Sequence, residues 1–212
     1  MTTAAVGAAA DALRAGSAVV LPNPHPLTSV VAATAPDVVN TAKGRPADQA
    51  VALWLADDDH WADFARILDL DPGTRALARD LLVREHLTLL LPLADVPDWV
   101  GPAARDGHAL VFGACWAPLR PVLTAAGRLH VSSANRTGHP PVSSAARARE
   151  VFPPEVHVLD LSDGLPAADR RATTTLRVGR GGTLAHTRSG AQDHAHGGPE
   201  AYLAHLRRSF VD

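Results

Sequence analysis

The sequence predicts an α/β protein, a single domain in which helices flank a twisted mixed sheet. Short apolar runs alternate with amphipathic segments of helical period through the first two thirds of the chain. Two strand-like runs, 173–178 and 183–186, then follow each other across the glycine-rich turn 179–182, which is typical of a hairpin. Helices that alternate with strands and end in a hairpin indicate one sheet of mixed strand direction.

The first elements are defined by the signals at their ends. A helix over 4–15 is expected to end at Gly16, and a buried strand over 18–21 to end at Pro22. Residues 22–26 include three prolines and cannot be helical, because each proline removes a donor and biases the residue before it toward extended geometry. This segment is therefore predicted as a rigid loop that follows a strand.

The same kinds of signal place the remaining elements. Helices are expected over 36–43, 57–68, 72–83, 119–126, 143–151 and 200–208. Strands are expected over 51–56, 87–93, 109–112, 129–131 and 156–161, besides the hairpin. Because no repeat or low-complexity linker divides the chain, residues 1–191 are predicted to form one domain. Residues 192–212 are predicted as a C-terminal connector and helix, with the Gly- and His-rich segment 190–199 mobile.

The composition excludes several classes of protein. The 212 residues carry 20 Lys+Arg and 22 Asp+Glu, a formal charge of −2, which argues against a strongly basic nucleic-acid binder. With 46% hydrophobic residues, the chain can bury a sizeable core and is not expected to be disordered. Its single cysteine, Cys115, cannot form an internal disulfide, and no apolar run is long enough to span a bilayer. We therefore expect a cytoplasmic protein with no signal peptide and no membrane partner.

The only lysine of the chain lies in the segment Lys43-Gly44-Arg45-Pro46, where a helix gives way to a strand. An ammonium and a guanidinium beside a glycine suit a polyphosphate or a carboxylate, because Lys acts as a point charge and Arg as a bidentate fork. The alternative is a solvated helix C-terminus, where the helix dipole favours cations.

A second polar run, 132–138, follows a short apolar strand. Ser133, Asn135 and Arg136 offer hydroxyl, amide and guanidinium groups at a strand end, where α/β sheets usually bind ligands. Ser and Asn also form hydrogen bonds with their own backbone in turns, so turn chemistry stays open as the alternative.

The order and spacing of four segments resemble the YrdC-like family of threonylcarbamoyl-adenylate synthases. These segments are 43–46, 87–92, 133–140 and 188–190. They are similar to the family patterns K-G-R-P, L-T-L-V-L-P, S-A-N-x-S-G-x-P and R-x-G, and the resemblance covers about residues 4 to 191. Family members condense threonine, bicarbonate and ATP to threonylcarbamoyl-AMP with release of pyrophosphate, for a modified tRNA adenosine. Related carbamoyl-adenylate-forming domains use carbamoyl phosphate and ATP.

The resemblance implies roles for the residues that this sequence keeps. Lys43 and Arg45 would act in catalysis and hold the phosphates of ATP, with its Mg²⁺, while Arg188 would reach the phosphates from the far side. Ser133 and Asn135 would line the same nucleotide pocket. No metal site made by the chain itself is predicted.

The sequence departs from the family pattern where threonine binds. The family loop P-T-E-T-x-Y-G-L is replaced by 22–29, in which Asn23 and His25 are the polar groups left to orient a second substrate. The arginine of the family's V-R-V-P strand falls at about Gly113, and a histidine that some members carry falls at about Trp54. The family's S-T-V-V-D segment corresponds to the stretch that contains Thr173. These changes predict a second-substrate pocket that is less cationic and more apolar, since an arginine fork on a carboxylate contributes roughly 1.5–3 kcal/mol.

Two functional classes follow from these observations. The first is an ATP-dependent nucleotidyltransferase that forms a carbamoyl or acyl adenylate from a nucleotide and a small carbamoyl or amino-acid-like substrate other than threonine. The second is a noncatalytic YrdC-like module that binds a nucleotide or structured RNA. Because the net charge is acidic, an RNA site on this chain would have to be local.

Overall fold

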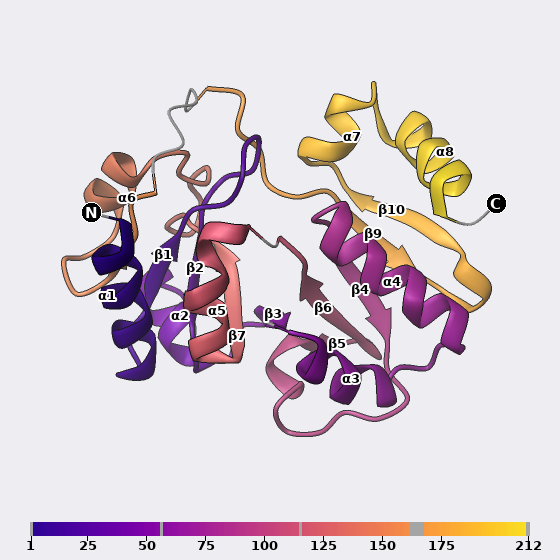
Figure 1. Cartoon of the computed structure of the whole chain (residues 1–212), viewed down its shortest axis with the longest axis horizontal. Helices are drawn as coiled ribbons and strands as arrows, with labels where there is room; N and C mark the ends of the chain where they lie inside the picture. Colours follow the sequence, from indigo (N-terminus) through magenta and orange to yellow (C-terminus); the bar gives the residue numbers. More distant parts are fainter. Residues whose placement is uncertain (1, 56, 115, 162–167, 211–212) are drawn as a thin grey trace.

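The computed structural model describes residues 2–55, 57–114, 116–161 and 168–210 (Figure 1). Cys115, on which the expected compartment depends, lies outside the described residues. The helices are α1 Thr2–Arg14, α2 Pro36–Lys43, α3 Asp58–Arg66, α4 Pro72–Arg84, α5 Arg120–Ala126, α6 Ala145–Val151, α7 Ala191–Ala195 and α8 Pro199–Phe210. The strands are β1 Val19–Leu21, β2 Val30–Ala33, β3 Ala52–Leu55, β4 Thr88–Pro92, β5 Ala104–Arg105, β6 His108–Phe112, β7 Arg128–Ser133, β8 His157–Val158, β9 Thr175–Val178 and β10 Leu184–Arg188.

The strands form one mixed sheet in the order β10-β9-β4-β6-β3-β7-β2-β1-β8, with β5 paired on β6. In its centre β3 runs parallel to β6 and antiparallel to β7, while β4 runs antiparallel to β6. The predicted hairpin is present as the antiparallel pair β9 and β10. The sheet confirms the predicted α/β class with mixed strand direction.

Helices cover the two faces of the sheet unequally. On one face, here called the α5 face, α1 and α5 pack over β1, β2, β3 and β7 around residues such as Leu13, Leu123 and Trp54. On the opposite face, the α4 face, α3, α4 and α8 pack over the side of the sheet that contains β4 and β9. Helices α2 and α6 cover the same α4 face at its other side, over β1 and β2. None of the helices in the described part of the chain has the length and apolar character needed to cross a membrane.

Three of these helices and strands were not predicted: β2, the short β5 and α7. Strand β2 is buried on both faces and pairs with β1 and β7, so its Val-Val-Ala-Ala sequence shows no alternation of polar and apolar residues. Helix α7 occupies part of 190–199, where we expected a mobile connector, and this expectation was wrong. The buried carboxylate of Asp193 accepts a hydrogen bond from Thr174, the residue before β9, and so holds this helix against the sheet. The domain boundary at residue 191 stays a prediction.

Candidate functional site

Four of the predicted site residues line one cavity on the α5 face, with a volume of about 210 Å³. They are Arg45, Ser133, Thr173 and Arg188. Other parts of the wall are hydroxyl-bearing or apolar and come from Thr28, Ser29, Thr88, Leu110, Phe112 and Val131, among others. None of the described residues that line this cavity is a carboxylate. Two guanidiniums among hydroxyls favour an anionic ligand such as a phosphate.

Arg45 enters the cavity from the loop that follows α2. Its Nε donates a hydrogen bond of 2.5 Å to Oδ1 of Asn40, whose amide in turn donates to the carbonyls of Ala47 and Gln49. Asn40 is fully buried and therefore fixes both the loop and the guanidinium. The Nη2 of Arg45 is buried and has no hydrogen-bond partner among the described residues. Burial also lowers the pKa of this guanidinium, but arginine stays protonated in proteins, so Nη2 is a charged donor that a ligand could satisfy.

Lys43 does not line the cavity, although it lies only two positions before Arg45, which does. It is the last residue of α2, and Gly44 ends the helix with a φ of 65°, a left-handed conformation that glycine adopts without strain. The ammonium of Lys43 is buried, and it donates to the carbonyl of Ser133 and, at 2.8 Å, to Oδ1 of Asn135. Burial and the nearby charge of Arg45 lower its pKa to about 7. Lys43 thus joins α2 to the end of β7.

Asn135 is the centre of the turn that follows β7. Its Oδ1 accepts from Lys43 and from the hydroxyl of Ser133 at 2.6 Å, and its Nδ2 donates to the carbonyls of Arg136 and His139. All the polar atoms of the Asn135 side chain are therefore used inside the protein. Ser133 lines the cavity and Asn135 does not, so the turn interpretation accounts for Asn135 in this structure.

Arg188 and Thr173 close the cavity at the end of β10. The Nη2 of Arg188 lies 3.4 Å from the carbonyl of Thr173, and burial lowers the pKa of its guanidinium. The hydroxyl of Thr173 contacts that of Thr88 on β4. The register of the sheet places Thr88, Phe112 and Thr175 side by side on the α5 face. Residues brought from three distant parts of the sequence thus meet at one polar surface.

The two polar residues of the loop 22–26 lie outside this cavity. Asn23 is buried, its Nδ2 donates to the carbonyl of Thr28 at 2.8 Å, and it lines a different cavity of about 250 Å³ with Arg170. His25 is exposed and lines none of the described cavities. The structure therefore does not bring Asn23 or His25 to the Arg45 and Arg188 cavity, and their role with a substrate stays a prediction.

Trp54 and Gly113 line a third cavity, at the ends of β3 and β6. Trp54 is buried and packs edge-on against Phe112, with ring centroids 5.0 Å apart. Phe112 lines both this cavity and the one with Arg45, so it lies between them. A Cβ at position 113 would lie 2.5 Å from the carbonyl oxygen of Leu82, so the backbone of α4 occupies the space that a side chain there would need.

Several residues that build the site were missed in the sequence. Asn40 carried no signal beyond its polarity inside a predicted helix, and its contacts depend on the loop 46–49 folding back. Thr88 was the polar residue of an otherwise apolar strand, and that interruption could have indicated a side chain facing a polar surface. The network of Thr174, Asp193 and Gly190 was missed because the segment 190–199 was expected to be mobile.

Comparison with known proteins gives matches only at the level of structure. No protein-family model matches the sequence, and no curated protein matches it either. The structure is similar to that of a double variant of P. abyssi Sua5, with a TM-score of 0.69 at 19% identity over 96% of this chain. A second structure of that protein, complexed with L-threonine, has a TM-score of 0.67 at 21% identity over 87% of this chain. E. coli YciO has a TM-score of 0.64 at 14% identity, with 90% of both chains covered. The chain has the YrdC-like fold.

The likeness extends to larger proteins with the same fold. Full-length HypF, in a phosphate- and nucleotide-bound form, has a TM-score of 0.62 at 16% identity over 87% of this chain, which covers 29% of HypF. The chain spans 59% and 54% of the length of the two Sua5 chains that it matches. At these identities the likeness establishes the YrdC-like fold alone.

Proposed function

We propose that the chain binds the phosphates of ATP in the Arg45 and Arg188 cavity and transfers the adenylyl group to a small carbamoyl- or acyl-type substrate. The observation that carries this proposal is the buried Nη2 of Arg45, which has no hydrogen-bond partner among the described residues and shares a cavity with Arg188. A buried charged donor without a partner is costly, and a bound phosphate oxygen would remove that cost. The nucleotide-bound HypF structure, which has the same fold, supports a nucleotide as the source of that phosphate.

The size and lining of the cavity limit what enters it. A volume of about 210 Å³ is below the roughly 300 Å³ at which pockets for whole ligands begin, so the phosphates fit inside and the nucleoside extends outside. No group of three or more His, Cys, Asp or Glu side chains that could hold a metal ion occurs among the described residues. Mg²⁺ would accordingly be held by the phosphates of the nucleotide.

The positions of the Arg45 and Arg188 guanidiniums suit the transfer of the adenylyl group from ATP. An oxygen of the carbamate or carboxylate substrate attacks the α-phosphorus of ATP, a new P–O bond forms, and the bond from the α-phosphorus to the bridging oxygen of the β-phosphate breaks. The electron pair of the broken bond leaves with pyrophosphate. Arg45 and Arg188 would stabilise the charge that develops on this leaving group, because charge-assisted hydrogen bonds are strongest to fully charged oxygens.

The second substrate is proposed to differ from threonine. The position that corresponds to the family arginine, Gly113, has no room for a side chain beside Leu82. Phe112 lines both the cavity beside Gly113 and the Arg45 cavity, and the ring of Trp54 packs edge-on against it. A small carbamoyl donor or a more apolar amine or amino acid fits these surroundings better than a free hydroxy-amino acid.

The proposal is tested by pyrophosphate release and by nucleotide binding, measured separately. The protein is mixed with ATP and either bicarbonate or carbamoyl phosphate, alone and with a panel of amino acids and amines. ATP binding is measured by calorimetry in the wild type and in Arg45→Gln. Loss of a charge-assisted contact of roughly 1.5–3 kcal/mol should weaken ATP binding by about one to two decades.

The matched control is Arg208→Gln, which removes an exposed arginine near the end of α8. Thermal unfolding of both variants shows whether they are folded. ATP affinity that is equal in wild type and in folded Arg45→Gln would overturn the assignment of the phosphate site. Nucleotide binding without pyrophosphate release from any mixture would overturn the catalytic half of the proposal and favour the noncatalytic nucleotide-binding module.

A further inference from the structure

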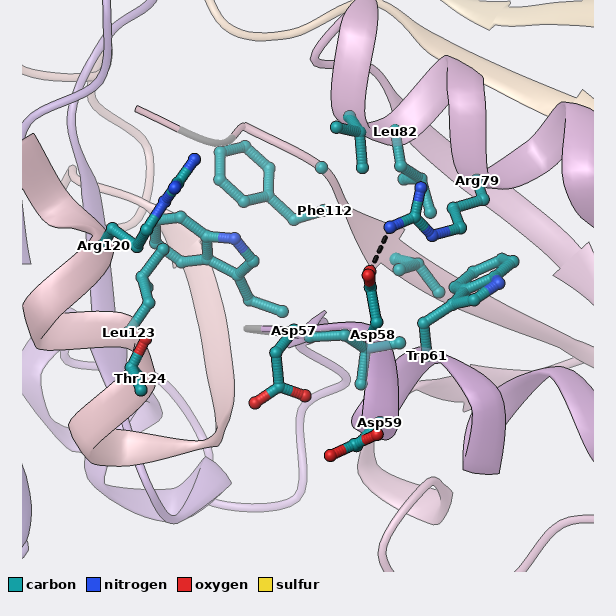
Figure 2. A pocket seen from close by; sticks show the side chains of 15 residues that line it. Asp57, Asp58, Asp59, Trp61, Arg79, Leu82, Phe112, Arg120, Leu123 and Thr124 are labelled. Carbon is teal, nitrogen blue, oxygen red and sulfur yellow. Dashed lines mark hydrogen bonds and ion pairs between the residues drawn. The ribbon is translucent and has the colours of Figure 1, made fainter. Parts of the chain in front are cut away.

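The cavity lined by Trp54 and Gly113, at the carboxyl ends of β3 and β6, has a volume of about 530 Å³ and is more than twice as large as the Arg45 and Arg188 cavity (Figure 2). We call it the switch-point cavity. Its two walls come from different helices: Asp57, Asp58 and Asp59 belong to the start of α3, and Arg120 and Thr124 to α5. Its volume is within the range of pockets that enclose a small organic molecule.

The topology of the sheet creates this cavity. Strands β3 and β6 are parallel neighbours, with Leu53 opposite Val111 and Trp54 opposite Phe112. After β3 the chain enters α3 on the α4 face, whereas after β6 it enters α5 on the α5 face. The two connections separate on opposite sides of the sheet and leave a crevice beyond the strand ends. In α/β sheets, such points of divergence are the preferred location of ligand sites.

The walls of the switch-point cavity carry opposite charges. On the α3 side, Asp58 is paired with Arg79, and Asp57 accepts a hydrogen bond of 2.9 Å from the backbone of His60 that lowers the pKa of its carboxyl. Asp57 also contacts the ring of His60. Asp59, on the same side, forms no ion pair with any described residue, and neither does Arg120 on the opposite wall. Figure 2 shows Arg120 on one side of the cavity and the three aspartates on the other.

Between these walls the surface is apolar. Val83 on α4 is 41% exposed and is one of only two large hydrophobic side chains classed as exposed among the described residues; the other is Val96. Val83 lines the switch-point cavity together with the half-buried Trp61 and the rings of Trp54 and Phe112. An exposed aliphatic side chain inside a hollow beside aromatic rings gains stability when an apolar group covers it.

We propose that the switch-point cavity binds a zwitterion whose ammonium and carboxylate are at opposite ends of an apolar body. The ammonium would lie against the carboxylates of the α3 wall, the carboxylate against Arg120, and the apolar body over Val83 and Trp61. A free α-amino acid carries both charged groups on one carbon, whereas the acidic and basic groups here lie on opposite walls of the cavity. Two sources share the required chemistry: an ω-amino acid and a short apolar peptide. This cavity contains neither Arg45 nor Arg188, but Trp54 and Gly113 line it, so the inference rests on the proposed function, which places these two positions beside the second substrate. Binding here is tested without nucleotide, so that its failure can be told apart from failure of the nucleotide site.

The test is calorimetric titration of the whole chain without nucleotide. The two-ended probes are 6-aminohexanoate, an ω-amino acid, and the dipeptide Leu-Leu. Three analogues serve as comparisons: hexylamine has no carboxylate, hexanoate has no ammonium, and leucine carries both charged groups on one carbon. The two-ended probes should bind more tightly than the one-ended analogues and than leucine. Of the two sources, the probe that binds more tightly identifies the ligand class.

Variants then test each part of the cavity. Arg120→Gln should weaken 6-aminohexanoate several-fold and leave hexylamine unchanged, because hexylamine has no carboxylate, and Asp59→Asn should weaken both. Val83→Trp fills the cavity from α4 and should abolish binding of every probe. Its matched control is Val96→Trp, which places the same ring at the other exposed valine, outside the described cavities.

The outcomes decide the proposal in either direction. Thermal unfolding confirms that Val83→Trp and Val96→Trp are folded, so that a loss of binding reports the cavity. If Val83→Trp binds the probes as Val96→Trp does, the site is elsewhere and the proposal is overturned. Equal affinity for 6-aminohexanoate and hexylamine, or no binding of any zwitterion, overturns it as well. ATP binding should be unaffected by Arg120→Gln, which separates this result from that of the nucleotide site.

Discussion

The ammonium of Lys43 donates a hydrogen bond of 2.8 Å to Oδ1 of Asn135. The two residues are 92 positions apart, at the end of α2 and in the turn after β7, and they belong to the two polar segments that the sequence singled out separately. Lys43 is 3% exposed, and burial together with the charge of Arg45 lowers its pKa from 10.5 to about 7. The contact therefore joins both segments through an amine that is partly charged at neutral pH.

The first prediction concerns the pH dependence of stability. On unfolding, Lys43 regains its ordinary pKa of 10.5, so between about pH 7 and pH 10.5 the unfolded chain binds more protons than the folded chain. This difference makes the free energy of unfolding rise with pH across that window, by up to about 1.4 kcal/mol per pH unit. This gain in the free energy of unfolding is complete above pH 10.5. It decreases as the pH falls and has been lost once the pH passes below about 7, where both states are protonated.

Lys43→Met removes this titration, so its free energy of unfolding should depend less on pH than that of the wild type. Denaturant unfolding at a series of pH values measures both slopes. Because Lys43 is the only lysine of the chain, no other lysine contributes to the difference. Equal slopes in the two proteins would contradict the buried, partly neutral state of the Lys43 amine.

The second prediction separates the two interpretations of Asn135. Its side chain makes hydrogen bonds to Lys43, Ser133, Arg136 and His139, so Asn135→Ala should lower the free energy of unfolding by roughly 1–3 kcal/mol. Asn135→Asp keeps the acceptor for Lys43 and loses the donor, and we expect it to lose less stability. ATP affinity should fall less in Asn135→Ala than in Arg45→Gln. A larger fall, with stability retained, would restore Asn135 to the nucleotide pocket.

The arrangement of these residues shows what the sequence could and could not predict. Helix α2, strand β4, strand β7 and the hairpin of β9 and β10 were expected within a few residues, because apolar periodicity and Gly, Pro and Asp end signals are local. Strand β2 was missed because its burial depends on β1 and β7 lying on either side, which no local pattern records. The resemblance predicts one nucleotide pocket made by Lys43, Arg45, Ser133, Asn135 and Arg188. Of these, Arg45, Ser133 and Arg188 line one cavity, together with Thr173, which was assigned to the second substrate.

The positions of Lys43 and Asn135 depend on contacts that form only in the fold. A lysine at a helix end was expected to face a ligand, but the nearest acceptors for its ammonium are the carbonyl of Ser133 and the amide of Asn135. The switch-point cavity could not be predicted either, because it arises from the opposite directions in which the chain leaves β3 and β6. Sequence alone gives the order of such elements but not the side of the sheet on which each helix packs.

The third prediction concerns the carboxylate that anchors α7. Asp193 is 2% exposed, and its Oδ1 accepts hydrogen bonds of 2.6 Å from both Thr174 and the backbone of Gly190. Burial raises the pKa of Asp193, but these hydrogen bonds outweigh it and hold the pKa below the ordinary 3.8. The stability that it contributes is therefore present above pH 3.8 and lost as the pH falls through the lower folded value.

Asp193→Asn should lower the free energy of unfolding at neutral pH by about 1–3 kcal/mol, because an amide replaces a charged acceptor. Hydrogen exchange should show faster exchange in α7 than in α2 for this variant. Asp37→Asn, at an exposed position in the first turn of α2, is the control and should change stability little. An Asp193→Asn protein as stable as the control variant would show that α7 does not depend on this carboxylate.

The fourth prediction tests the close packing of Gly113 against α4. A Cβ at this position would lie 2.5 Å from the carbonyl oxygen of Leu82, so Gly113→Ala should destabilise the protein by about 1–3 kcal/mol. At Gly7, in α1, nothing lies within 4 Å of the added carbon, so Gly7→Ala should be neutral or stabilise by up to about 1 kcal/mol. Thermal unfolding of both variants measures the difference. Equal effects at the two positions would show that α4 can move away.

The last prediction follows from that packing and concerns threonine. Because the backbone of Leu82 leaves no room for a side chain at position 113, an arginine there cannot hold a substrate carboxylate in this chain. Trp54 and Phe112 pack edge-on at the same end of the sheet and leave an apolar surface. Without a charge-assisted contact of roughly 1.5–3 kcal/mol, free threonine should bind about one to two decades more weakly than with such a contact. Pyrophosphate release from ATP and bicarbonate should therefore hardly increase when threonine is added, and the gene should fail to complement a strain that lacks its own threonylcarbamoyl-adenylate synthase. The control for the assay is a threonine-dependent synthase measured under the same conditions. Robust threonine-dependent release by this chain would show that other side chains, such as Arg188 or Arg45, hold the carboxylate in place of the missing arginine.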